Sequence, residues 1–116
     1  MPGIRTVRVH DLHDDDAGAR YLVDRLWPRG VAKASLRLTG WARDAAPSDE
    51  LRRWFGHDPE RFGEFRSRYL KELKSQRDRI AELRRRAKEG PLTILYGARD
   101  REHNDAVVLA DLLRGR

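Results

Sequence analysis

Three segments of the chain carry the hydrophobic pattern expected of β-strands. Ile4, Val7 and Val9 form a short β-prone segment, and an apolar run interrupted by Asp24 covers residues 20–26. Leu92–Tyr96 reads Leu-Thr-Ile-Leu-Tyr, a run continuous enough to be buried on both faces of a parallel sheet. These segments predict a small, mostly parallel sheet.

Helical periodicity fills most of the remaining chain. Ser48 is expected to cap a helix over 49–55, which Gly56 can end in a left-handed conformation. A second helical start is expected at Asp58-Pro59, and its apolar register continues through 62–87, with a break near 75–78.

The last helix is expected at about 102–114, directly after the third strand, which makes half of a βαβ unit. The stretch 27–47 is expected to be loop. The 116 residues therefore predict a single α/β domain with a mostly parallel three- to four-stranded sheet packed with helices.

Composition narrows the classes of function. The chain has no cysteine, which excludes a disulfide scaffold, a thiolate nucleophile and a cysteine-ligated metal site. No stretch approaches the roughly 20 apolar residues of a membrane helix, and the first residues lack the apolar run of a secretory signal. We expect a cytoplasmic protein with no membrane partner and no cofactor.

The formal net charge of +6 suggests an acidic partner such as nucleic acid. Arginines supply 21 of the 25 basic residues, and a GC-rich genome can cause the same bias. In the predicted helices the arginines alternate with acidic residues, a pattern typical of a solvated, ion-paired face. Charge alone therefore does not identify a nucleic-acid site.

Two polar motifs follow predicted strands, where the loops of a parallel sheet converge and ligands commonly bind. The first is Asp24-Arg25-Leu26-Trp27-Pro28-Arg29-Gly30, followed by Lys33; the second is Tyr96-Gly97-Ala98-Arg99-Asp100, followed by Glu102-His103-Asn104. The carboxyl edge of the sheet is therefore the predicted site.

The first motif suits an anionic ligand. Arg25, Arg29 and Lys33 supply several donors close in sequence, and arginine binds phosphate or carboxylate through two parallel hydrogen bonds. Trp27 is either a stacking surface for a planar ligand or a cap on the core. Arg25 is either a ligand residue or the ion-pair partner of an aspartate in one of the two motifs.

The second motif offers a candidate general base. His103 titrates near neutral pH, and Asp100 can orient its imidazole. Alternatively Asp100 caps the last helix while Asn104 bonds nearby backbone. Asn104, Tyr96 and His57 complete the candidate ligand residues; His57 lies at a helix junction, where it is either a site residue or a structural hydrogen-bond donor.

No metal site is expected. The four histidines lack the His-x-x-x-His spacing of metal ligands. His10, Asp11, His13 and Asp14 lie close in sequence, but such clusters are usually solvated turns. No glycine-rich phosphate loop or nucleophile elbow is present in the sequence either.

Asp24-Arg25-Leu26-Trp27-Pro28-Arg29-Gly30-Val31 with Lys33 resembles the signature of the YeaO-like family, domain of unknown function 488. The resemblance continues through Trp54-Phe55-Gly56-His57-Asp58-Pro59 to His103-Asn104 and covers nearly the whole chain. It implies a compact α/β fold in the bacterial cytoplasm and carries over no catalytic assignment. At Asp105 the chain departs from the neutral or histidine residue expected of many relatives.

Three functional hypotheses follow. The first is a small-ligand site in which Arg25, Arg29 and Lys33 bind an anion beside His103 and Asp100, with or without catalysis. The second is a nucleic-acid-binding module that uses the arginine-rich helices and Trp27, Trp41 or Trp54. The third is a structural or interaction protein, whose main feature would be a self-association surface.

Overall fold

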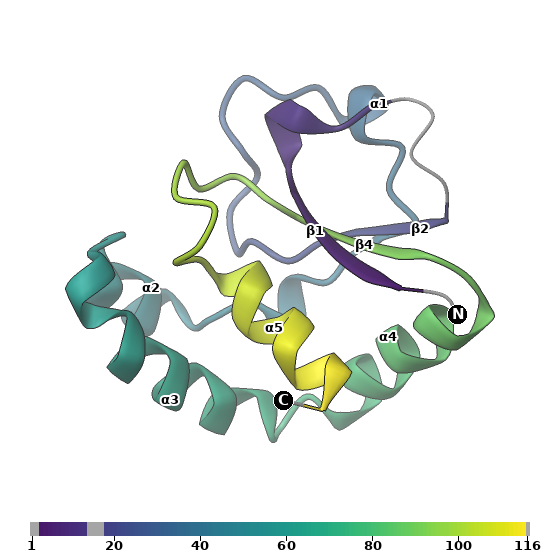
Figure 1. Ribbon diagram of the computed structural model, residues 1–116. Coiled ribbons are helices and arrows are strands. Elements are labelled where there is room, and N and C mark those ends of the chain that lie inside the picture. The colour runs from purple at the N-terminus through teal and green to yellow at the C-terminus, as the bar shows by residue number, and fades with distance from the viewer. Residues whose placement is uncertain (1–2, 14–17, 116) are drawn as a thin grey trace.

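A parallel sheet organises the molecule (Figure 1). The computed structural model describes residues 3–13 and 18–115, and in this part of the chain four strands pair in the order β1-β4-β2-β3. The strands are β1 (Ile4–Arg8), β2 (Ala19–Leu22), β3 (Gly40–Trp41) and β4 (Leu92–Tyr96). The predicted α/β class with a mostly parallel sheet of three to four strands is confirmed.

The central strand is β4, the segment with the strongest apolar pattern. All five of its residues are buried, and it pairs in parallel with β1 on one edge and β2 on the other. Tyr96 is opposite Arg8 of β1, and Leu95 is opposite Leu22 of β2. Because the three strands run in the same direction in close register, their carboxyl ends meet at one edge of the sheet.

Helices cover one face of the sheet. They are α2 (Asp49–Phe55), α3 (Phe62–Leu73), α4 (Arg77–Glu89) and α5 (Asp105–Arg114). Figure 1 shows α5 beside the sheet, with α3 on the outer side of α5. Helix α4 also packs directly on the sheet, because Glu82 accepts a hydrogen bond from Tyr21 of β2. The opposite face is covered by the connection from β2 to β3, which contains the short helix α1 (Lys33–Leu36).

Each face of the sheet has its own core. Tyr21 and Ile94 point into the larger one, where they join Phe65, Tyr69 and Leu109 of the helical layer. The smaller core contains Val9, Leu22, Leu36 and Leu95, with Trp27 and Trp41 packed against it. Because successive side chains of a strand point to opposite faces of the sheet, the strands contribute residues to two separate apolar clusters.

The helix ends follow the capping residues in the sequence. The Ser48 hydroxyl accepts a hydrogen bond from the Leu51 amide, and Gly56 ends α2 at φ 54°. Helix α3 ends at Leu73 and α4 begins at Arg77, so the expected break in the long register is confirmed. These ends are satisfied locally, as expected of capped helices.

The last helix begins later than predicted. Asn104 caps it, because its Oδ1 accepts a hydrogen bond from the Val107 amide at 3.0 Å. Asp100 instead accepts hydrogen bonds from the amides of Glu102 and His103, which folds the preceding segment into a turn. The prediction that α5 starts near residue 102 with Asp100 as its cap was therefore wrong.

Two further predictions need correction. The second strand ends at Leu22 instead of continuing to residue 26, because the chain leaves the sheet at the first polar motif. The stretch 27–47 is not all loop, since it contains α1 and β3. Strand β3 is only two residues long, too short for an alternating pattern to be visible, and it pairs with Tyr21 and Leu22 of β2.

Replacement of Gly18 by alanine should destabilise the fold. Gly18 lies just before β2 at φ +92°, and a Cβ atom there would be 2.1 Å from the carbonyl oxygen of Pro91. Left-handed strain and this contact together should lower the free energy of unfolding by roughly 2 kcal/mol or more, a decrease in Tm of about 8 °C by thermal unfolding. The control is Gly63→Ala in α3, where no atom lies within 4 Å of the added Cβ and Tm should not decrease. Equal Tm values for Gly18→Ala and the parent protein would contradict the close approach of Gly18 and Pro91.

Candidate functional site

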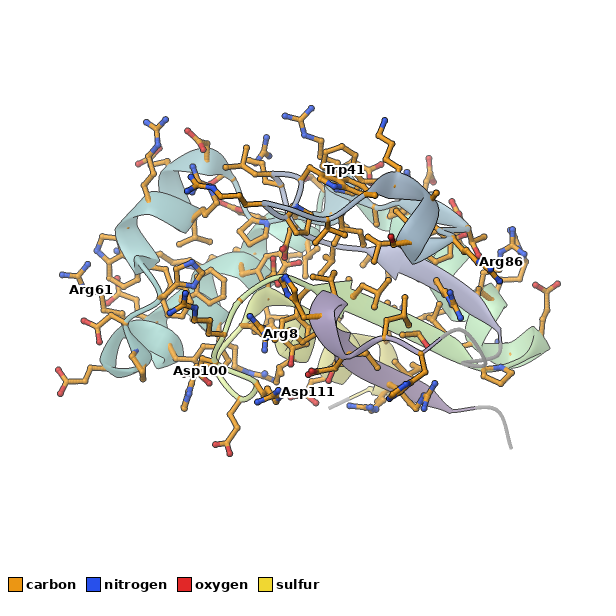
Figure 2. All side chains as sticks on the ribbon, turned by 90° about the horizontal axis from the view of Figure 1, so that it is seen from above. Arg8, Trp41, Arg61, Arg86, Asp100 and Asp111 are labelled. Atoms are coloured by element: carbon orange, nitrogen blue, oxygen red, sulfur yellow. The ribbon has the colours of Figure 1, made fainter. Side chains whose placement is uncertain are left out.

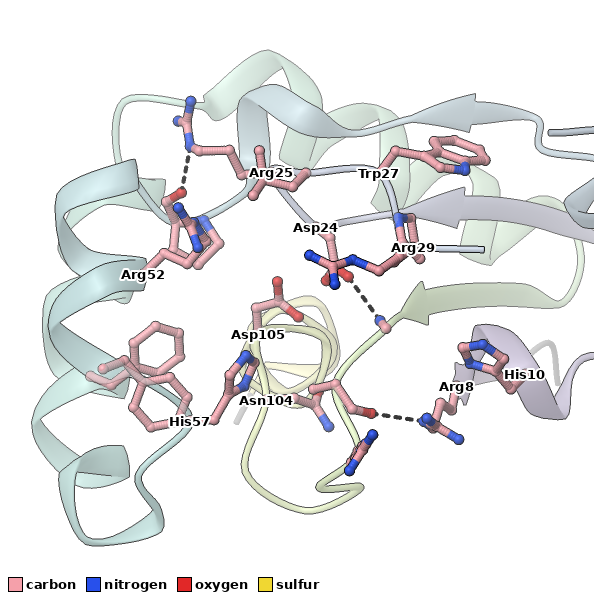
Figure 3. A pocket seen from close by; sticks show the side chains of 18 residues that line it. Arg8, His10, Asp24, Arg25, Trp27, Arg29, Arg52, His57, Asn104 and Asp105 are labelled. Carbon is pink, nitrogen blue, oxygen red and sulfur yellow. Dashed lines mark hydrogen bonds between the residues drawn. The ribbon is translucent and has the colours of Figure 1, made fainter. Parts of the chain in front are cut away.

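A cavity of about 490 Å³ opens at the edge where β1, β2 and β4 end (Figure 3). Its walls come from the end of β1, the loops after β2 and β4, the end of α2, and the start of α5. The polar and charged lining residues are Arg8, His10, Asp24, Arg25, Arg29, Arg52, His57, Arg99, Asn104 and Asp105. The cavity thus lies where the sequence predicts a site.

Asp24 joins the two loops that carry the polar motifs. Its Oδ2 accepts a hydrogen bond from the Gly97 amide at 2.8 Å, drawn as a dashed line in Figure 3. A Cβ atom at Gly97 would lie 3.1 Å from this carboxylate and 3.4 Å from the side chain of Pro28. Glycine therefore allows the loop after β4 to approach the loop after β2 closely.

Asp24 and Asp105 form a hydrogen-bonded acidic pair at the bottom of the cavity. Burial raises the pKa of Asp105 well above its ordinary value, and the neighbouring charge of Asp24 raises it further. Burial also raises the pKa of Asp24, although the hydrogen bonds from Asp105 and the Gly97 amide oppose that increase. The pKa values of both carboxyl groups are raised, because two adjacent carboxyl groups cannot readily both ionise, and the two groups titrate as a pair.

Arginines surround this acidic pair. Among the described residues, five of them line the cavity: Arg8, Arg25, Arg29, Arg52 and Arg99. Backbone carbonyls position two of them: Arg8 Nε donates to Ala98 at 3.1 Å, and Arg25 Nε donates to Pro47 at 2.9 Å. Arg52 is held by an ion pair with Asp49 at 2.6 Å.

Arg29 and Arg99 differ from the other three. Within residues 3–13 and 18–115, neither guanidinium makes a hydrogen bond or an ion pair. Both are exposed, and they enter the site from the two different polar motifs. The cavity therefore has two unpaired cations at its entrance.

His57 reaches the cavity through an unusual backbone conformation. It has φ 58° directly after Gly56 at φ 54°, so two consecutive residues are left-handed at the end of α2. A residue with a Cβ atom rarely adopts this conformation, and such positions are enriched at functional sites. The preceding Phe55 is fixed by stacking on Phe65 at 4.2 Å between ring centroids.

Trp27 is fixed by the loop in which it lies. Its Nε1 donates to the Val31 carbonyl at 2.7 Å, and its ring meets Trp41 edge-on at 5.4 Å between centroids. It packs against the smaller core and also lines the cavity. Its packing fits the interpretation of Trp27 as a cap on the core, whereas stacking on a planar ligand stays a prediction.

The structure brings together some predicted site residues and separates others. Arg25, Trp27, Arg29, His57 and Asn104 line the cavity. The lining does not include Lys33, Tyr96, Asp100 or His103. Lys33 is exposed at the start of α1, whereas Tyr96 is only 2% exposed at the end of β4.

The predicted His103 and Asp100 pair exists but lies beside the cavity. His103 Nδ1 is 2.9 Å from Asp100 Oδ2, and the imidazole packs edge-on to Phe62 at 5.1 Å between centroids. The hydrogen bond from the Glu102 amide is the largest cause that lowers the pKa of Asp100, and the bond with His103 adds to it. Asp100 is therefore an ionised carboxylate that orients a half-buried imidazole.

Five charged residues that line the cavity were not predicted as site residues, although Asp24 and Arg99 belong to the two polar motifs. Arg8 is the last residue of β1, and Arg99 follows β4. Their positions next to strand ends could have identified both as site residues. No sequence pattern identifies Arg52 as a site residue, because only the packing of α2 brings it to the cavity. The pairing of Asp24 with Asp105 joins residues from separate elements. It could not be predicted without the strand order, which brings these elements together.

Among the described residues, no three His, Asp or Glu side chains gather as potential metal ligands. Asp14 of the sequence cluster lies outside these residues. No described helix combines the length and apolar character that a membrane span requires.

The tryptophans proposed for nucleic-acid stacking are covered by side chains of the protein itself. Arg68 lies over Trp54 at 4.5 Å from the ring centroid, and Arg61 lies at 5.4 Å. Arg43 lies over Trp41 at 5.5 Å. Figure 2, which labels Trp41 and Arg61, shows charged side chains projecting from much of the surface.

Comparison with known proteins agrees with the motif resemblance. A family model described as "Inactive DUF488-N3 subclade" matches residues 3–116. Uncharacterized protein Rv3073c of Mycobacterium tuberculosis (strain ATCC 25618 / H37Rv) is 45% identical over 113 residues, 97% of this chain and 95% of that protein. Uncharacterized protein YeaO of Escherichia coli (strain K12) is 43% identical over 111 residues, 96% of each chain. No solved structure gives a significant match. The chain therefore belongs to the YeaO-like family of DUF488 proteins.

Proposed function

We propose that the cavity at the carboxyl edge of the sheet binds a small ligand through an anionic group. The observation that carries this proposal is the pair of unpaired arginines, Arg29 and Arg99, at the entrance of a cavity with three further arginines. Guanidinium groups that converge without carboxylate partners repel one another, and a phosphate or carboxylate relieves that repulsion.

The acidic pair does not neutralise these arginines. The raised pKa values of Asp24 and Asp105 favour retention of a proton by the pair, which then contributes less negative charge than two free carboxylates would. The lining therefore keeps an excess of positive charge. A partly enclosed cavity strengthens the attraction of that charge for an anion, because protein walls screen charge less than water does.

The rest of the lining suits the body of a small organic ligand. Phe55, Phe65, Pro28 and Pro47 give apolar surface, and Leu26 is 52% exposed beside them. A cavity of about 490 Å³ is within the usual size of small-molecule sites, roughly 300–1,000 Å³. We infer a ligand that joins an anionic group to a compact apolar or planar part.

Binding explains these features without a reaction. The candidate base His103 and its partner Asp100 lie outside the lining of the cavity. The description of the matching family model also contains the word inactive. We therefore propose a ligand-binding role for this chain and assign no catalytic step.

The nucleic-acid alternative has less support. The exposed faces expected to stack on bases are occupied, because arginines lie over Trp41 and Trp54. Several helix arginines are also engaged in ion pairs, among them Arg66 with Asp111 at 3.1 Å and Arg79 with Asp44 at 2.8 Å. Arginines held in such pairs are less available to contact the phosphates of a nucleic acid.

Arg29→Ala should remove most of the stabilisation of the protein by anions. In a thermal-shift titration with phosphate, sulfate and a nucleotide, a ligand at a hundredfold excess over its Kd stabilises the folded state by about 2.7 kcal/mol. For a domain of this size the parent Tm should then rise by roughly 10 °C. The variant should lose most of that rise.

Lys33→Ala is the matched control for this experiment. It removes one exposed positive charge from the same sequence motif, but Lys33 does not line the cavity. Its anion-dependent increase in Tm should be close to that of the parent protein. Failure of every anion to raise the Tm of the parent protein would overturn the proposed function.

Asp105→Asn should flatten the dependence of stability on pH. The folded state holds the proton of the acidic pair more tightly than the unfolded chain, so folding takes up a proton above pH of about 4. The free energy of unfolding of the parent should therefore fall as pH rises from about 4 through the raised pKa of Asp105. Asparagine keeps the neutral, hydrogen-bonding form and loses this dependence.

Thermal unfolding from pH 4 to pH 8 measures this effect. Each tenfold difference in proton affinity between folded and unfolded states corresponds to about 1.4 kcal/mol, so Asp105→Asn should gain stability over the parent toward pH 8. Glu102→Gln, at an exposed acidic residue, should leave the pH profile unchanged. Parallel profiles for the parent and Asp105→Asn would show that the pair does not share a proton.

A further inference from the structure

A second cavity, distinct from the first, lies among α3, α4 and α5. Its volume is about 680 Å³. The apolar part of its lining, here called the floor, is formed by Leu70, Leu73, Ile80, Ala81 and Leu112. Figure 1 shows these three helices converging on the side of the molecule away from the polar loops. We call this cavity the helical groove.

Positive charge surrounds the helical groove. The remaining lining residues are all basic: Lys74, Arg77, Arg84, Arg85 and Lys88. No acidic side chain is among the lining residues, all of which are described. The groove thus combines an apolar floor with an entirely cationic rim.

Four of these five cations are free, unlike many others on the same layer. Lys74, Arg77, Arg85 and Lys88 make no side-chain hydrogen bond or ion pair with any residue of 3–13 or 18–115. Arg84 donates to the Leu112 carbonyl at 3.2 Å. Elsewhere on the helical layer, arginines are paired with acids, as in the ion pairs Arg53 with Asp49 and Arg68 with Glu64.

The charges of α4 separate by face. Arg77, Ala81, Arg84 and Lys88 recur at intervals of three and four residues and therefore lie on one side of the helix, which lines the groove. The acids Asp78, Glu82 and Glu89 fall on the adjoining side. Glu82 is turned to the sheet, where it accepts a hydrogen bond from Tyr21 Oη at 2.5 Å. Charges that alternate in the sequence are thus segregated in space.

We propose that the helical groove binds an amphipathic helix of a partner protein, with leucine-like side chains on the floor and acidic residues against the rim. Recognition of an apolar helical stripe in a groove is a common mode of protein association. Complementary charges at the rim fix the orientation of such a helix and accelerate its association.

The floor favours a peptide over the other polyanions that a cationic surface attracts. A nucleic-acid backbone has no apolar side chains with which to fill the floor, and no aromatic residue lines the groove to stack on a base. A membrane surface is attracted by cations but cannot enter a concave groove as a single helix can. An acidic amphipathic helix can place apolar side chains on the floor and carboxylates against the basic residues of the rim.

The test uses the full chain and fluorescence anisotropy. The probe is a labelled peptide with leucines at positions i, i+4 and i+7 and glutamates on both sides of that stripe. It should bind, and the affinity should decrease as salt increases. A peptide with serines in place of the leucines, and another with lysines in place of the glutamates, should each bind at least tenfold more weakly.

Variants locate the binding to the groove. The double variant Arg77→Glu with Lys88→Glu reverses two free rim charges and should weaken binding of the acidic peptide at least tenfold. Lys71→Glu reverses an exposed charge on α3 outside the lining and should change the affinity less than twofold. Equal Tm values of variants and parent would confirm that folding is unaffected.

Three results would overturn the proposal. The first is no binding of the acidic peptide, and the second is equal binding of the serine peptide. The third is tighter binding of duplex RNA, duplex DNA or anionic lipid vesicles than of the peptide, if the double variant with reversed rim charges abolishes that binding. The result that supports the proposal is binding that requires both the leucines and the glutamates and is lost in the double variant.

Discussion

The arrangement of the molecule depends on parallel pairing along both edges of β4. This strand is buried throughout, and its backbone bonds to β1 on one side and β2 on the other. Any parallel pair needs a long crossover, so the chain between these strands must fold into helices and loops that cover the sheet. The same pairing brings the ends of three strands, and the polar loops that follow them, to a single edge.

The site is assembled from this edge by short-range contacts. The bond from the Gly97 amide to Asp24 joins the two loops, and Asp105 completes the acidic pair at the start of α5. The arginines come from several elements and are aimed by carbonyl acceptors such as those of Ala98 and Pro47. Positive charge therefore gathers around a pair of carboxyl groups whose pKa values are both raised.

Much of the fold could be predicted from local patterns. The predicted limits of β4 agree with the structure because its continuous apolar run is buried. The predicted limits of α2 agree because Ser48 and Gly56 cap its two ends. Strand β3 and helix α1 were not predicted because they span only two and four residues. They depend on tertiary hydrogen bonds, such as the one that the Ala42 amide donates to the Leu22 carbonyl. The start of α5 was misplaced because Asp100 and Asn104 are both good caps, and packing decides between them.

The site could be predicted only in part. Residues next to strand ends were found, as Arg25 and Arg29 show, whereas Arg52 and the Asp24–Asp105 pair require knowledge of which elements pack together. Asp105 places a carboxyl group in the lining of the cavity, next to that of Asp24.

The most direct test of the central claim is a titration of ¹⁵N-labelled protein with phosphate, followed by ¹H–¹⁵N spectra that include the arginine side chains. If the cavity binds the anion, the Arg29 and Arg99 Nε signals and the Gly97 amide signal should shift progressively and saturably, while the arginines of the helical groove change only at higher phosphate concentration. Unchanged Arg29, Arg99 and Gly97 signals, or shifts of equal size for all exposed arginines, would contradict the assignment of this cavity as an anion-binding site.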